Sequence, residues 1–160
     1  MASEGEIRRV QGSRVEAQAI TEIAPDHNTV PVIRTIAMPS DTNPAGDIFG
    51  GWLMSQMDLG ASTIATRRAR GRTVTAAVDG MSFLSPVFVG DEVTIFGRIV
   101  SSGRSSMRVY VEAWRRNRVS DDIDKVTHAT FTFVAIDAER KPRLGRGASP
   151  IERNHVIPLL

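Results

Sequence analysis

The sequence contains no cysteine. This absence excludes disulfide frameworks, thiolate zinc sites and a cysteine nucleophile. The sequence also has no run of about 18 apolar residues, so it predicts no membrane-spanning helix. Its first residues, from Met1 to Arg9, are polar and mixed in charge, without the apolar segment of a secretory signal. We therefore expect a cytoplasmic protein that does not bind membranes.

Length and charge are those of an ordinary globular domain. The 160 residues, 41% hydrophobic and 24% charged, favour one domain that can bury a core without disulfides or structural metals. The net charge is only +2, although the pI of 9.6 is high because most basic residues are arginine. Basic clusters at 67–72, 115–118 and 140–143 suit either phosphate groups or solvated surface. Nucleic-acid binding is disfavoured, because 67–72 contains no aromatic residue and no recognised motif.

The pattern of the chain predicts an α+β domain. We expect a mobile N-terminal arm at 1–28, a domain from Thr29 to Gly147 and a C-terminal tail at 148–160. One long helix is expected, from Phe49 to Arg68, with Gly71 as its stop. Because successive strands follow without helical crossovers, the sheet should be antiparallel. The predicted strands are Thr29 to Met38, Thr73 to Met81, Asp91 to Val100, Ser106 to Arg116 and Val126 to Asp137.

Two features predict that both the helix and the outer face of the sheet are covered by further protein. The helix carries apolar residues at helical spacing with small residues between them, so we expect it to be buried on most sides. The face of the sheet away from the helix would carry Phe96, Tyr110 and Trp114. A single helix cannot cover both faces, so exposed aromatics would favour a homo-oligomer.

Four motifs resemble those of a known family. The segments Asn43–Asp58 (NPAGDIFGGWLMSQMD), Met81–Asp91, Gly103–Ser106 and Phe131–Asp137 occur in the same order as in hotdog-fold acyl-CoA thioesterases of the YciA type. The resemblance covers roughly Ile33 to Arg143. It implies a central helix wrapped by a curved five-stranded antiparallel sheet. It also implies a homohexamer, built as a trimer of edge-to-edge dimers, whose active sites lie across the dimer interface.

The resemblance also implies an activity, hydrolysis of acyl-CoA to free CoA and a carboxylic acid. No separate cofactor is expected, since CoA is part of the substrate and product. Asp47 would be the catalytic carboxylate, as general base or as nucleophile. The alternative role of Asp47 is a helix N-cap. Gly50 and Gly51 would expose backbone amides that polarise the carbonyl, or would simply allow close packing. Asn43 would orient water or stabilise the loop, and Asp41 suits a turn.

The CoA arm requires a phosphate-binding surface. Arg104, Ser105 and Ser106, after Gly103, offer a guanidinium and two hydroxyls, although the same residues also suit an ordinary hairpin turn. We do not expect Lys141 and Arg143 to be essential.

Other chemistries fit less well. The three histidines, His27, His128 and His155, are too scattered for a metal site or a Ser-His-Asp arrangement. A hotdog dehydratase would need a histidine at the site, and none lies near Asp47 in the sequence. The methionines Met54, Met57 and Met81 suit the core or an acyl pocket. The competing function is a noncatalytic acyl-CoA binder or sensor on the same scaffold.

Overall fold

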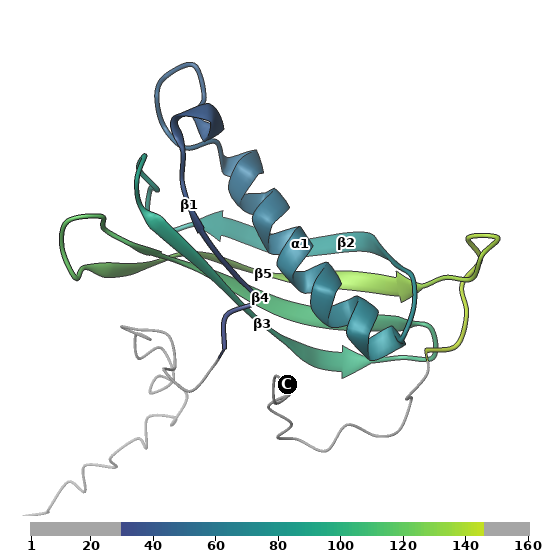
Figure 1. Ribbon diagram of the computed structural model, residues 1–160. Coiled ribbons are helices and arrows are strands. Elements are labelled where there is room, and N and C mark those ends of the chain that lie inside the picture. Colours follow the sequence, from purple (N-terminus) through teal and green to yellow (C-terminus); the bar gives the residue numbers. More distant parts are fainter. Residues whose placement is uncertain (1–29, 146–160) are drawn as a thin grey trace, which may run out of the picture.

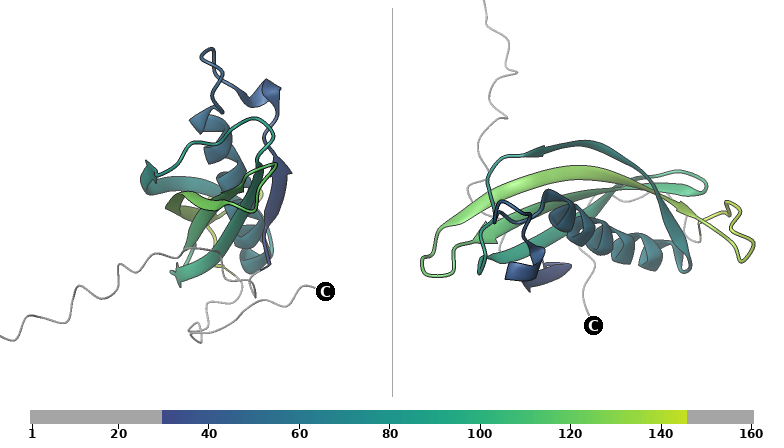
Figure 2. Two further views of the ribbon diagram at one scale, coloured as in Figure 1. Left: turned by 90° about the vertical axis from the view of Figure 1, so that its left-hand side faces the viewer. Right: turned by 90° about the horizontal axis from the view of Figure 1, so that it is seen from above.

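The computed structural model describes residues 30–145, so the predicted arm and tail lie outside the described residues. One long helix packs against one sheet, as Figure 1 shows. The sheet has five antiparallel strands in the order β1-β3-β4-β5-β2 and curves around α1, as seen from above in Figure 2. The predicted α+β hotdog architecture is therefore confirmed. The elements are β1 (Ile33–Ile36), η1 (Pro39–Asp41), α1 (Gly50–Ala69), β2 (Thr73–Phe83), β3 (Glu92–Ser102), β4 (Ser106–Arg116) and β5 (Ile123–Ala135).

The core lies between α1 and the concave face of the sheet. Glycines let the two layers approach closely. A Cβ atom at Gly60 of α1 would lie 2.8 Å from Val32, and one at Gly97 of β3 would lie 2.7 Å from Ile64. The prediction that α1 is buried on most sides is wrong for the single chain, because Met54 and Leu59 on its other side are 40% and 55% exposed. The residues that α1 buries are Leu53, Met57, Gly60, Ala61, Ile64, Ala65 and Ala69.

Element ends differ from the predictions where the chain has local hydrogen-bonding alternatives. β1 is much shorter than expected, because the chain turns into η1, where the amide of Met38 donates to Asp41 Oδ2 at 2.9 Å. β5 begins at Ile123 rather than at Val126. The helix ends one residue later than predicted, and Arg70, not Gly71, takes the left-handed conformation after it (φ 47°).

The C-terminal end of α1 is held by Arg143. Its guanidinium donates to the carbonyl oxygens of Ala69 at 3.0 Å, Ile136 at 3.1 Å and Leu144 at 3.1 Å. A Cβ atom at Gly71 would collide with this guanidinium, so the glycine is needed for the approach. Arg143 therefore ties the helix to the segment that follows β5.

Replacing Arg143 with alanine is expected to lower the free energy of unfolding by about 2–3 kcal/mol, since three carbonyls lose a charged donor and two of those bonds are partly buried. Chemical denaturation at fixed protein concentration measures the change. Lys141→Ala in the same exposed segment is the control, with an expected change within about 0.5 kcal/mol. Equal effects of the two substitutions would contradict the assigned role of Arg143.

The outer face of the sheet does not expose the aromatic surface expected from the sequence. Trp114 is only 2% exposed and Phe96 only 7%, while Tyr110 is half-buried. The ammonium of Lys125 lies 5.4 Å from the ring centroid of Trp114, so its aliphatic stem helps to cover the indole. Exposed aromatics therefore give no argument for an oligomer, and that prediction is wrong in its premise.

One edge of the sheet, strand β2, has backbone hydrogen-bonding groups that are unpaired within the described chain. β2 stands at the edge and pairs only with β5, so the other side of its 11-residue backbone is unpaired within the described chain. The pairing with β5 shifts register between Thr75 and Ala77 and again between Asp79 and Ser82, near Gly80 (φ +43°). A long, exposed edge of this kind is a ready site for pairing with another strand.

Candidate active site

The loop before α1 is closed by Asn43. Thr42 and Ile48 form a β-bridge, and the amide of Asn43 donates to the carbonyl of Asp47 at 2.7 Å. The side-chain Oδ1 of Asn43 accepts from the amides of Ala45 at 2.9 Å and Asp47 at 3.1 Å. Asn43 thus stabilises the loop and fixes the backbone of Asp47, which agrees with one of its two predicted roles.

Asp47 itself is exposed and does not cap the helix. The N-cap residue of α1 is Phe49, and it makes no side-chain capping bond. Within residues 30–145 the carboxylate of Asp47 has no hydrogen-bond or ion-pair partner, whereas Asp41 accepts from Met38 and is a turn residue as predicted. The capping interpretation of Asp47 is therefore wrong, which leaves its carboxylate open to solvent.

The first two helical amides are also uncommitted. Trp52 and Leu53 already donate to the carbonyl of Phe49, at 2.9 and 3.3 Å. The amides of Gly50 and Gly51 have no acceptor in the described part of the chain, as expected for the first turn of a helix. Both glycines are also closely packed, since a Cβ atom at Gly50 would lie 3.2 Å from Phe83. Close packing and free amides thus occur together.

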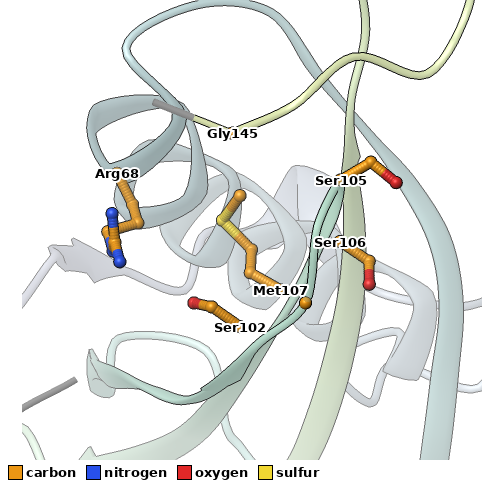
Figure 3. Close-up of a pocket in the computed structure, with 7 residues that line it drawn as sticks. Arg68, Ser102, Ser105, Ser106, Met107 and Gly145 are labelled. Atoms are coloured by element: carbon orange, nitrogen blue, oxygen red, sulfur yellow. The ribbon is translucent and has the colours of Figure 1, made fainter. Parts of the chain in front are cut away.

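A second group of predicted residues lies in the hairpin between β3 and β4. The amide of Gly103 donates to the carbonyl of Ser106 at 2.7 Å, which closes the turn. A solvent-open hollow lies beside it (Figure 3). Arg104 is not among its lining residues. The hollow is lined by Arg68, Ser102, Gly103, Ser105, Ser106, Met107 and Gly145.

The cation at this hollow is one that the sequence analysis did not single out. Arg68, near the end of α1, lines the hollow, whereas Arg104 of the turn does not. In Figure 3 the hydroxyl of Ser102 points to the side on which Arg68 lies, whereas the hydroxyls of Ser105 and Ser106 point away. The basic run 67–72 was the available signal, but nothing in the sequence links the run to the hairpin.

The two groups of predicted residues lie at opposite ends of α1. Asp47 and the free amides lie at its N-terminal end, whereas Arg68 and the hairpin lie at its last turn. A 20-residue helix is about 30 Å long, at about 1.5 Å per residue. One chain therefore does not bring the carboxylate and the hairpin together.

Several other candidate residues have structural roles. Arg115 of the second basic cluster bonds Asp91 at 3.1 Å and Asp124 at 2.6 Å. Burial works to lower the pKa of Arg115, but these carboxylates raise it overall, so the residue stays charged. His128 lies 6.0 Å from the ring centroid of Tyr110, on the sheet. Met57 is fully buried in the core.

Residues 30–145 contain neither a metal-binding cluster nor a membrane-spanning helix. No group of three His, Asp or Glu side chains there is placed to hold a metal ion. No helix in the same range is long and apolar enough to cross a membrane.

Comparison with known proteins relates this geometry to thioesterases. Residues 45–120 match the model of the thioesterase superfamily. The acyl-CoA thioester hydrolase YciA of Escherichia coli K12 is 50% identical over 124 residues, which span 76% of this chain and 91% of YciA.

Solved structures agree with this relationship. The hexameric thioesterase y2039 from Yersinia pestis is 50% identical, with a TM-score of 0.71 over 76% of this chain and 98% of its own. An aspartate-to-alanine variant of HI0827, a hexameric broad-specificity acyl-CoA thioesterase, is 46% identical, with a TM-score of 0.71 over 75% of this chain and 88% of its own. The chain therefore belongs to the YciA-type family of hotdog-fold acyl-CoA thioester hydrolases.

Proposed function

We propose that the protein hydrolyses acyl-CoA thioesters with Asp47 as its reacting carboxylate. The observation that carries the proposal is the exposed, unpartnered carboxylate of Asp47 in the loop that leads directly to two free amides, those of Gly50 and Gly51. The aspartate variant of HI0827 supports an aspartate-dependent reaction in a similar enzyme. Acyl-CoA is the substrate class of the similar enzymes YciA and HI0827.

The amides at the start of α1 would stabilise the reaction's developing charge. When the thioester carbon is attacked, negative charge grows on the carbonyl oxygen. Preorganised amide donors at such a position, aided by the helix dipole, lower the barrier by about 3–4 kcal/mol. The amides of Gly50 and Gly51 are uncommitted, and the rings of Phe83 and Phe49 occupy the space that a Cβ atom at either position would take.

Asp47 could act by either of two routes, as a general base or as a nucleophile. As a general base, its carboxylate takes a proton from water while the water oxygen bonds the carbonyl carbon. As a nucleophile, a carboxylate oxygen bonds the carbonyl carbon and forms an anhydride, which water then hydrolyses. In the general-base route the C–S bond breaks and the proton that Asp47 took from water passes to the CoA sulfur. In the nucleophile route CoA leaves as a thiolate and takes up a proton released by the water that hydrolyses the anhydride. In either case Asn43 holds the backbone of Asp47 in place.

The hairpin would bind the CoA phosphates of a neighbouring subunit's substrate. In one chain the hairpin lies at the far end of α1 from Asp47. Thr73 starts β2 at the hairpin end, where Ser106 and Thr73 both pair with the end of β5, and Phe83 ends β2 beside Gly50. If two copies join antiparallel along β2, the two-fold axis sets Asp47 of one copy at the hairpin end of the other.

The assembly proposed here is a dimer through β2, repeated three times in a hexamer. The unpaired edge of β2 supports the dimer, and the hexameric relatives support the larger assembly. Arg68 and Ser102 would then supply a guanidinium and a hydroxyl to phosphate from one side of the hairpin. The predicted Arg104, Ser105 and Ser106 would offer a second guanidinium and two hydroxyls from the turn itself.

The proposed activity is tested by release of free CoA. Purified protein should release CoA from several acyl-CoAs of different chain length, and EDTA should not change the rate. A thiol-reactive dye reports the product. If no acyl-CoA is hydrolysed above background but calorimetry detects acyl-CoA binding, the noncatalytic binder becomes the function and the hydrolase proposal is lost.

A further inference from the structure

Two aromatic rings flank the free amides at the start of α1. A Cβ atom at Gly50 would lie 3.2 Å from Cζ of Phe83, and one at Gly51 would lie 2.5 Å from Cε1 of Phe49. The side chains of Phe83 and Phe49 are nonetheless 52% and 56% exposed. Each ring therefore rests on the first turn of the helix and leaves the rest of its surface uncovered.

Phe83 stands on a fixed backbone. It is the last residue of β2 and pairs with Thr127 of β5. The hydroxyl of Thr127 donates to the carbonyl of Ser82 at 2.9 Å, and the amide of Leu84 donates to Val126 at 2.7 Å. Hydrogen bonds on both sides thus hold the ring against Gly50, so its position does not depend on a flexible loop.

The chemistry of the site indicates that the acyl group of the substrate covers these rings. The inference rests on the proposed function, in which a thioester carbonyl binds the amides of Gly50 and Gly51. The acyl carbons are bonded directly to that carbonyl, so the first carbons of the acyl group must pass beside the rings.

We propose that Phe83 and Phe49 form the acyl-binding surface of this site, and that Phe83 determines specificity for acyl groups longer than acetyl. The ring of Phe83 lies with one edge against the helix and about half of the side chain is exposed, so it can serve as a contact surface for an acyl group. Each methylene that it covers improves transition-state binding of a longer acyl group. An acetyl group, with a single methyl, gains little from it.

The test compares hexanoyl-CoA with acetyl-CoA as substrates of Phe83→Ala. We expect kcat/KM to fall about tenfold for hexanoyl-CoA and less than about threefold for acetyl-CoA, since a hydrophobic contact of this size discriminates by about that factor. Phe83→Leu should recover part of the loss, because it restores apolar contact. Phe88→Ala is the matched control: Phe88 is similarly exposed (48%), but its ring faces Arg115. It should leave the ratio of the two substrates unchanged.

A second measurement does not need turnover. Calorimetry should show that S-hexyl-CoA binds the wild-type protein several-fold more tightly than CoA does, and that Phe83→Ala loses this difference. A wild-type protein that hydrolyses no acyl-CoA would overturn the proposed function alone, because the calorimetric comparison still tests Phe83.

Two results for Phe83→Ala would overturn the proposed role of Phe83 in acyl specificity. It is overturned if an active Phe83→Ala keeps the wild-type ratio of the two substrates. It is also overturned if the ratio shifts toward hexanoyl-CoA, which would make the ring an obstruction. Light scattering covers the remaining outcome: a variant that dissociates and loses both substrates equally would assign Phe83 to the subunit interface.

Discussion

Replacing Asp47 with asparagine is expected to lower kcat at least about a hundredfold, the lower range for the loss of acid–base assistance. Its side chain neither caps α1 nor makes a hydrogen bond or ion pair with another described residue, and its backbone bonds to Asn43 survive the substitution. The free energy of unfolding should therefore change by less than about 0.5 kcal/mol. Steady-state CoA release and denaturant unfolding of the same preparation measure both quantities.

The matched control is Asp41→Asn in the same loop. Asparagine can still accept the hydrogen bond from the amide of Met38, so turnover should stay within about threefold of wild type. Near-normal turnover of Asp47→Asn would transfer the reaction to another group, with Asp41 the first to examine. Single-turnover hydrolysis in isotopically labelled water separates the two routes, because only the nucleophile route leaves label in the carboxylate of Asp47.

Mixing two inactive variants is expected to restore about a quarter of the wild-type activity, if each site uses Asp47 of one copy and the hairpin of another. One variant is Asp47→Asn. The other carries Arg68→Glu and Arg104→Glu, which reverse the charge at the hairpin. In a random equimolar mixture about a quarter of sites draw both intact parts. The variants are unfolded, mixed and refolded together, then assayed for CoA release.

A second mixture tests the same architecture with the opposite bias. A chain that carries all three substitutions is mixed with an equal amount of wild type. Shared sites again leave about a quarter of the activity, whereas sites contained within one chain leave about half. An active monomer on light scattering would refute the shared site. A failure of the first mixture, with about half activity in the second, would return the hairpin to its own chain.

The fold followed from the sequence because its signals are local. Alternation of apolar residues in Ser106 to Arg116 predicted β4 with its observed ends, and the helical spacing after Phe49 predicted α1 within one residue. The predictions were wrong where tertiary contacts determine burial or backbone conformation. Trp114 alternates as an outward residue, yet is buried beneath neighbouring side chains on its own face. The left-handed position fell on Arg70 because the backbone of the helix end, and not the nearest glycine, sets it.

The site was only partly predictable, for the same reason. The loop from Asn43 to Gly51 is contiguous, so its residues could be grouped from sequence alone. Arg68 and Ser102 are 34 residues apart and meet only because the β3–β4 hairpin folds back to the end of α1. Nor could sequence tell that Phe83, at the end of β2, rests on Gly50. Contacts of this kind need the topology.

The two register shifts in β2 bear on which partners the protein accepts. A regular, flat edge strand is a template for any extended chain, including unfolded protein, whereas an irregular one twists locally and interrupts the ladder. A strand with shifts after Thr75 and after Asp79 pairs along its length only with a strand whose irregularities fall at matching places. Two-fold symmetry provides such a strand in an identical copy. If two copies pair along β2 as proposed, the irregular edge would favour an identical copy and would disfavour the addition of unrelated extended chains.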